Sequence, residues 1–231
     1  MSRPGRPPCR DEVRHPLVRT KQGTPETIES IRYEGELWAQ GLRRVAGVDE
    51  VGVGPLAGPV IAAAVILPVR CVIEGVRDSK KLTARRRELL AQEIRRRAVG
   101  VGIGAADIAE INRLNIYHAA LLAMRRAIEA LAEPPDYVLC DARTIPGIGC
   151  PQKAIIRGDC LSHSIAAASI IAKVHRDALM MAYDPVYPDY GFARHKGYPT
   201  AEHRQALARC GPCPLHRADF AGVKERRSLF P

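Results

Sequence analysis

Short, nearly continuous apolar runs alternate along this chain with segments in which apolar residues recur at helical spacing. The short runs lie at about 45–51, 58–67, 98–104, 137–141 and 153–156. Runs of this length, bounded by glycine, proline or charged residues, are typical of strands buried in a sheet. The pattern therefore predicts five strands.

The helical spacing predicts helices between and after these strands. Thr24 and Thr83 stand where a helix N-cap is needed, and Leu89, Leu90 and Ile94 are expected to face inward on the helix that follows Thr83. The expected helices span 25–41, 85–97, 115–131, 161–182 and 200–210. Strands that alternate with helices favour an α/β domain, and the early strands, which lack intervening helices, favour a mixed sheet.

Positive charge is spread unevenly along the chain. The chain has 35 Lys and Arg residues against 25 Asp and Glu, a formal charge of +10; residues 1–22 carry six Lys and Arg against two acids, and residues 191–231 carry eight against three. Such a surplus favours a polyanion such as nucleic acid as the ligand. We expect a basic, disordered tail over 1–24, a catalytic domain over 25–182 and a helical, substrate-binding C-terminal region over 183–231.

The apolar runs and the cysteines indicate where the protein works. The longest apolar run, 56–67, is interrupted by Gly58 and Pro59 and falls short of the roughly 20 residues that cross a bilayer. Seven cysteines, an odd number, do not suggest a disulfide framework, and Cys210 and Cys213 lack the second ligand pair of a zinc site. We therefore expect a cytoplasmic protein that contacts no membrane, and a monomer, because no oligomerisation signal is visible.

Four carboxylates stand where a sheet would bring them together. Asp49, Asp141 and Asp159 each come at or just after the end of an apolar strand, which is where ligand sites of open α/β sheets lie. If the first, fourth and fifth strands are neighbours, these three side chains converge. Glu50 points away from Asp49 in a regular strand, so it joins them only if the chain leaves strand geometry or if its carbonyl oxygen is the ligand.

Carboxylates held this close repel one another unless cations neutralise them, and their oxygen atoms suit Mg²⁺ or Mn²⁺. Two such ions about 3.5–4 Å apart can activate a water molecule and stabilise the leaving oxygen of a phosphodiester. The alternative is that each acid only forms a turn or caps a helix, as Asp159 would ahead of the helix at 161–182. For any single acid the sequence leaves this alternative open.

The chain resembles bacterial ribonuclease HII in five blocks, which follow the family's order between about residues 33 and 222. The blocks are GVDEVGVGPLAGPV, DSKKLT at 78–83, YVLCDA at 137–142, RGDCLSHSIAAASIIAKVHRD at 157–177 and YGFARHKGYPTAEH at 190–203. The resemblance implies a ribonuclease H-like fold, a mixed five-stranded sheet flanked by helices with a small helical C-terminal region. It also implies an endonuclease that cuts RNA in RNA–DNA hybrids and 5′ of single ribonucleotides embedded in DNA, leaving 3′-hydroxyl and 5′-phosphate ends.

The resemblance also implies roles for single residues. The catalytic metal ligands would be Asp49, Glu50, Asp141 and Asp159, with two Mn²⁺ or Mg²⁺ ions bound beside the substrate. Backbone groups around Gly52 and Gly54 would bond the ribose 2′-hydroxyl, which separates RNA from DNA. Tyr198 would pack on the deoxyribose that follows the ribonucleotide. The remaining substrate contacts would come from Lys80, Arg157, Arg194, His195 and Lys196.

Val53 departs from the family, which usually has Arg or Lys between these two glycines. A missing phosphate contact predicts weaker substrate binding with a shallower salt dependence. Because a non-basic residue here is similar to ribonuclease HIII, one alternative is a hybrid nuclease with less selectivity for the junction. Another is a nucleic-acid-binding protein that has lost catalysis, which the four retained carboxylates disfavour.

Overall fold

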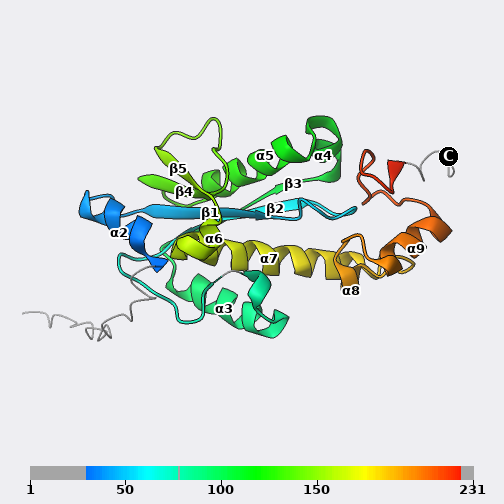
Figure 1. The fold of residues 1–231 in the computed structure, drawn as a ribbon, viewed down its shortest axis with the longest axis horizontal. Coiled ribbons are helices and arrows are strands. Elements are labelled where there is room, and N and C mark those ends of the chain that lie inside the picture. Colours follow the sequence, from blue (N-terminus) through cyan, green and yellow to red (C-terminus); the bar gives the residue numbers. More distant parts are fainter. Residues whose placement is uncertain (1–29, 78, 225–231) are drawn as a thin grey trace, which may run out of the picture.

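The computed structural model describes residues 30–77 and 79–224 of the chain (Figure 1). The tail expected over 1–24, the cap Thr24 and the helix start at Pro25 lie outside these residues. The described part of that helix is α2, Arg32–Ala39, which ends before Gly41. No described helix combines the length and apolar character that crossing a bilayer requires.

Five strands form one mixed sheet in the order β3-β2-β1-β4-β5. Their bounds are β1 Val45–Val51, β2 Val60–Ile66, β3 Gly100–Ala106, β4 Tyr137–Asp141 and β5 Gln152–Ile155. β2 is antiparallel to β1 and β3, whereas β4 runs parallel to β1 and β5. The predicted mixed five-stranded sheet is confirmed, and its first, fourth and fifth strands are neighbours, as convergence of the carboxylates requires.

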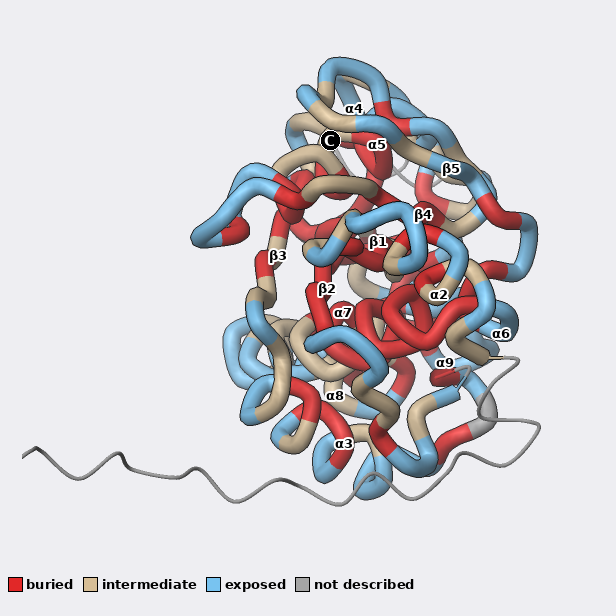
Figure 2. Tube along the Cα trace, turned by 90° about the vertical axis from the view of Figure 1, so that its left-hand side faces the viewer, coloured by how far each residue is buried: buried red, intermediate tan, exposed pale blue. Residues whose placement is uncertain are grey.

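Helices cover both faces of this sheet, with α5 on one face and α3 and α7 on the other (Figure 1). The helices that follow α2 are α3 Ala84–Arg97, α4 Ile108–Leu114, α5 Ile116–Glu129, α6 Gly158–Leu161, α7 His163–Tyr183, α8 Phe192–His195 and α9 Ala201–Cys210. A short 3₁₀ helix spans Ser79–Lys81. Figure 2 shows the buried residues concentrated in β1, β2 and α7, at the centre of the molecule.

Two details of the helices differ from the sequence-based expectation. Thr83 caps α3 as predicted, and Leu90 and Ile94 are buried, but Leu89 is 51% exposed, so its predicted inward orientation is wrong. Residues one apart on a helix do not share a face, whereas those four apart do. The helix α4 was not expected. Its start is marked in the sequence by a D-x-x-E pattern, in which Asp107 and Glu110 form a capping box.

Glycines on the strands allow the covering helices to approach the sheet closely. A Cβ atom built on Gly47 of β1 would lie 2.1 Å from the carbonyl carbon of Ser164 on α7. A Cβ atom on Gly104 of β3 would lie 2.1 Å from the carbonyl oxygen of Ala123 on α5. Real Cβ atoms essentially never approach so closely, so β1 and α7 are in backbone contact next to the position of Asp49.

The segment after α7 packs back onto the turn between β1 and β2. The N–H of Leu56 donates to the carbonyl of Gly197, and the N–H of Gly58 to that of Leu215, each at 2.9 Å. Ala57 forms an isolated β-bridge with His216. The C-terminal region therefore helps to shape the glycine-containing turn that follows the first two carboxylates, while its boundary at 183 stays a prediction.

Candidate active site

Asp49 and Asp141 lie side by side at the carboxyl ends of two neighbouring parallel strands. The register pairs Val48 of β1 with Cys140 of β4, so the next residue on each strand is one of these aspartates. Side chains in register on adjacent strands leave the same face of a sheet. The structure thus brings together two acids that are far apart in the sequence.

Asp49 is enclosed between β1 and α7. It is 7% exposed, its Oδ1 accepts the backbone N–H of Glu50 at 2.8 Å, and Ser169 on α7 lies beside the carboxyl group. Burial raises the pKa of Asp49 well above its usual range, and the charges of Glu50 and Asp141 raise it further. The charged form of Asp49 is therefore unfavourable here unless a cation lies beside it.

Asp141 and Asp159 meet where α6 begins. The Oδ1 atom of Asp141 accepts the N–H of Gly158 at 2.7 Å, and burial raises the pKa of Asp141, with a further contribution from the charge of Asp159. Asp159 is 6% exposed, and its Oδ2 lies 3.6 Å from the Nζ of Lys80. Asp159 does not cap α7, because the side chain of Ser162 does so.

Glu50 begins on the opposite face of β1, as the alternation of a strand requires. The strand continues through Val51, and the departure from strand geometry comes only at Gly52, with φ +96°. One carboxyl oxygen of Glu50 lies 3.2 Å from Nη1 of Arg143, and the other is buried without a hydrogen-bond partner among the described residues. Burial raises the pKa of Glu50. The positive charge of Arg143 lowers this pKa, and the negative charge of Asp141 raises it further.

These four acids have the chemistry of a divalent cation site, but they do not form a finished cage. All their possible metal ligands are oxygen atoms. The pKa values of three of the four carboxyl groups are raised, and Glu50 has one buried oxygen without a hydrogen-bond partner among the described residues. Within 30–77 and 79–224, no three His, Cys, Asp or Glu side chains are arranged to hold an ion. For a cation shared by Asp49 and Asp141 to gain a third carboxylate ligand, Glu50 would have to move away from Arg143, or Asp159 away from Lys80.

The raised pKa of Asp49 predicts how stability responds to pH. A carboxyl whose pKa is higher in the folded than in the unfolded chain destabilises the fold at neutral pH, and this penalty disappears as the pH falls below the unfolded value of 3.8. Without divalent ions, Asp49→Asn should therefore melt above the unchanged protein at pH 7, by a margin that shrinks toward pH 4. Calorimetry across this range would measure it, and a constant margin would contradict the prediction.

The turn after β1 places the two predicted glycines in different surroundings. A Cβ atom on Gly52 would lie 2.3 Å from Nε of Arg176, and the positive φ of Gly52 also favours glycine. Gly54 is exposed, and a Cβ atom there would meet nothing within 4 Å. Val53 between them is half-buried against the α5 side of the core, so it offers no charge to a ligand. The turn can therefore admit a ligand at Gly54.

Three of the predicted basic positions lie on the surface. The side chain of Lys80 is 82% exposed and its Nζ lies near Asp159. Arg157 is exposed with φ +56°, directly before the glycine that bonds Asp141. Arg194 forms an ion pair with Glu202. Lys80 and Arg157 thus lie beside the carboxylates, whereas Arg194 lies on the surface in a pair with Glu202.

His195 and Lys196 hold the turn that carries Tyr198. His195 is buried; its Nδ1 accepts the N–H of Gly197 at 3.2 Å, so Nε2 carries the proton that is donated to the carbonyl of Tyr190 at 2.7 Å. Because both ring nitrogens of His195 already have hydrogen-bond partners, this geometry does not support the phosphate contact expected of His195. The Nζ of Lys196 donates to a carbonyl of its own helix. Tyr198 itself is 37% exposed, with the Nζ of Lys173 5.5 Å from its ring centroid.

The sequence reading missed the polar residues that support these positions. Ser169 and Arg176 lie on α7, within a helix interpreted only as apolar, and Arg217 lies in a segment interpreted only as basic. The clearest available signal was an arginine within an apolar helix, since a buried guanidinium needs partners. Arg143, two residues after Asp141, carried no such signal, because its contact with Glu50 depends on the pairing of β1 with β4.

The C-terminal cysteines and histidines form a chain of hydrogen bonds. Nδ1 of His216 lies 3.2 Å from the Sγ of Cys213, and Nε2 of His216 lies 3.0 Å from Nε2 of His203. Burial lowers the pKa of both histidines to about 4, so they are neutral at pH 7. In the described residues the six cysteines are free thiols. Each group in this chain is hydrogen-bonded to the next, so we interpret the chain as a feature that stabilises the fold.

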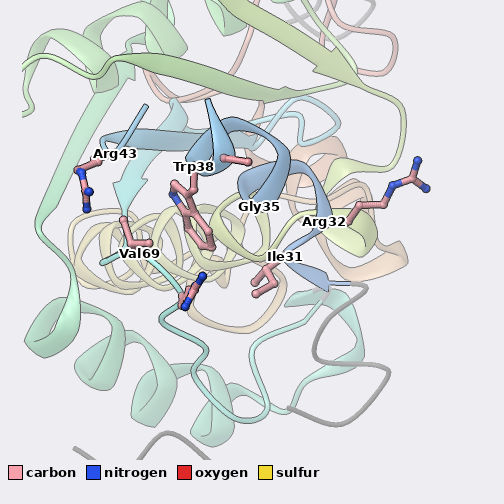
Figure 3. A pocket seen from close by; sticks show the side chains of 8 residues that line it. Ile31, Arg32, Gly35, Trp38, Arg43 and Val69 are labelled. Carbon is pink, nitrogen blue, oxygen red and sulfur yellow. The ribbon is translucent and has the colours of Figure 1, made fainter. Parts of the chain in front are cut away.

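One described hollow lies beside α2, away from the carboxylates. It measures about 550 Å³, and Figure 3 shows Trp38, Ile31 and Val69 around it, with Arg43 nearby. None of the four acids lines it. We place the candidate site at the strand ends, because chemistry there follows from clustered ionisable groups rather than from cavity size.

Comparison with known proteins points to one family. The model of the family described as ribonuclease HII matches residues 46–223. The ribonuclease HII of Syntrophotalea carbinolica is 54% identical over 200 residues, which cover 87% of this chain and 96% of that protein. The crystal structure of the ribonuclease H2 from Pyrococcus horikoshii superposes with a TM-score of 0.69 at 24% identity, covering 81% and 98% of the two chains. Bst-RNase HIII in complex with Mn²⁺ gives a TM-score of 0.66 at 19% identity, covering 90% and 74%.

Proposed function

The chain belongs to the ribonuclease HII family of ribonuclease H endonucleases, and from that premise we propose that it incises DNA 5′ of single embedded ribonucleotides as well as cutting the RNA strand of hybrids. The observation that carries the proposal is the placement of Asp49 beside Asp141 at the ends of β1 and β4. Asp159 and Glu50 lie near enough for their charges to act on this pair. The ends produced would be a 3′-hydroxyl and a 5′-phosphate.

Asp49, Glu50, Asp141 and Asp159 would hold two Mg²⁺ or Mn²⁺ ions. When bound, such ions supply an activated water and stabilise the charge on the leaving oxygen. The acids supply the negative charge, and the backbone fixes their geometry: Gly158 orients Asp141, and the N–H of Glu50 orients Asp49. The Mn²⁺ complex of Bst-RNase HIII, which shares this fold, is compatible with the assignment.

The glycine turn and Tyr198 would select the ribonucleotide. The turn begins at Gly52, two residues after Glu50, so a ribose bonded there would lie near the acids. Tyr198 is partly exposed and is held from below by Lys173 and Arg176, whose charged groups lie 5.5 and 5.8 Å from its ring centroid. A ring fixed in this way can pack on a sugar that lacks the 2′-hydroxyl, which favours RNA–DNA junctions.

Replacing Val53 by arginine should strengthen substrate binding. One added phosphate contact releases about one more counterion, so the slope of log K against log salt should become steeper by about 0.9. Fluorescence anisotropy of a ribonucleotide-containing duplex at several salt concentrations measures this slope. Val53→Leu is the matched control, because it changes size without charge. An unchanged slope in Val53→Arg would show that other basic residues already make this contact.

Two duplexes test the proposed function against its alternatives. One contains a single ribonucleotide and the other a long RNA stretch, and both are offered to the protein with Mg²⁺ and then with Mn²⁺. Cleavage of both supports the proposal. Cleavage of the long hybrid alone would favour the HIII-like alternative that Val53 suggests, and binding without cleavage would favour a catalytically inactive protein. Monomeric state and cytoplasmic location stay predictions, the first open to size-exclusion chromatography.

A further inference from the structure

A fully buried guanidinium group lies inside the turn that follows β1. Arg217 has no exposed surface, and its five N–H groups all donate to peptide carbonyls of the turn. The acceptors are the carbonyls of Gly58 at 3.0 and 2.8 Å, Val53 at 3.1 Å, Pro55 at 2.7 Å and Gly52 at 2.5 Å. No described carboxylate forms an ion pair with Arg217, so its positive charge is balanced by these carbonyl dipoles and by the ring of Phe220, whose centroid lies 5.0 Å from Cζ.

A second buried arginine joins this turn to the one that carries Tyr198. Arg176, on α7, donates from Nε to the carbonyl of Pro59, from Nη2 to that of Ala57 and from Nη1 to that of Lys196, each at 3.0 Å. It too is fully buried. The two places expected to contact the sugar are thus connected through a single side chain.

The direction of the carbonyls fixes the direction of the amides. In a trans peptide the C=O and the N–H of one unit point opposite ways, and there are no cis bonds in the described chain. The carbonyls of Gly52 and Val53 point at Arg217, so the N–H groups of Val53 and Gly54 point away from it. Neither N–H group donates a hydrogen bond to any other described residue. Gly54 is also exposed, with open space where a side chain would stand.

We propose that Arg217 is a positioning residue for ribose recognition, which holds the N–H groups of Val53 and Gly54 ready for the 2′-hydroxyl oxygen of the substrate, with Arg176 fixing the turn against Tyr198. This inference rests on the proposed function. Two outward N–H groups beside each other make a concave site that favours an oxygen ligand. The buried positive charges of Arg176 and Arg217 add to the attraction of this site for an oxygen ligand, whereas the side chain of Val53 in the same turn is neutral.

The test compares binding of two duplexes that differ by one hydroxyl group. An Asp141→Asn background prevents cleavage, and anisotropy gives the Kd for a duplex with one ribonucleotide and for the same duplex in DNA throughout, both with Mg²⁺. Arg217→Lys keeps the charge but has three donors, too few for the carbonyls that Arg217 holds. We expect it to reduce the preference for the ribonucleotide by about tenfold, the scale of one or two hydrogen bonds. Arg176→Lys should reduce it less.

Arg44→Lys is the matched control, because Arg44 also makes several hydrogen bonds, to Asp136 and Glu133, at the other end of β1. It should leave the preference unchanged, and melting temperatures would verify that each variant folds. If the parent prefers the ribonucleotide and a folded Arg217→Lys keeps that preference, the inference on Arg217 is wrong while the proposed function stands. If the parent shows no preference and the unchanged protein cuts neither duplex, both are wrong.

Discussion

Asp141→Asn should fold like the unchanged protein and lose nuclease activity by at least about 10²–10³-fold, the scale expected when a group that stabilises transition-state charge is removed. The amide can still accept the N–H of Gly158, which Asp141 bonds at 2.7 Å, so the start of α6 should stay in place. It cannot supply the negative charge that a divalent ion requires. Single-turnover cleavage of a ribonucleotide-containing duplex measures the loss, and calorimetry verifies the fold.

Asp136→Asn provides the matched control at the other end of the same strand. Asp136 accepts the backbone N–H groups of Arg43 and Arg44 and pairs with the Arg44 guanidinium, and these hydrogen bonds lower its pKa. Its replacement should cost stability while leaving the cleavage rate unchanged. The opposite result, with activity retained in Asp141→Asn, would remove the acids at the ends of β1 and β4 from the mechanism.

Gly47→Ala should destabilise the protein more than any surface substitution. The new Cβ atom would lie 2.1 Å from a backbone carbon of Ser164, and backbone atoms cannot move aside as a flexible side chain can. We expect a loss of about 3 kcal/mol or more in the free energy of unfolding, from overpacking, and a melting temperature lower by roughly 6–12 °C for a chain of this size. Thermal unfolding followed by circular dichroism measures the shift.

Gly35→Ala is the matched control for this substitution. Gly35 lies within α2, and a Cβ atom there would meet nothing within 4 Å. Alanine is favoured over glycine inside a helix by roughly 1 kcal/mol, so the melting temperature should stay the same or rise. Similar melting temperatures for both alanine variants would mean that β1 and α7 are not in backbone contact.

Much of this architecture could be predicted from local sequence patterns. The run at 45–51 matches β1 in both bounds, and Thr83 caps the helix that it was expected to cap. The pattern also placed Asp49 and Asp141 near the carboxyl ends of their strands, since an apolar run that meets an acid is visible in the sequence itself; Asp141 is the last residue of β4, whereas β1 continues through Val51. Leu89 was misplaced because two adjacent leucines fit the helical period equally well, and only packing against the sheet selects Leu90.

The sequence by itself determined the strands, most of the helices and the acids near the strand ends, because each depends on residues close together in the chain. The tertiary structure alone decided that Arg143 pairs with Glu50, that His195 turns inward and that Arg217 reaches the carbonyl of Gly52, 165 positions earlier. Such contacts leave no local pattern, because a buried polar group takes whichever partner the folded chain brings to it.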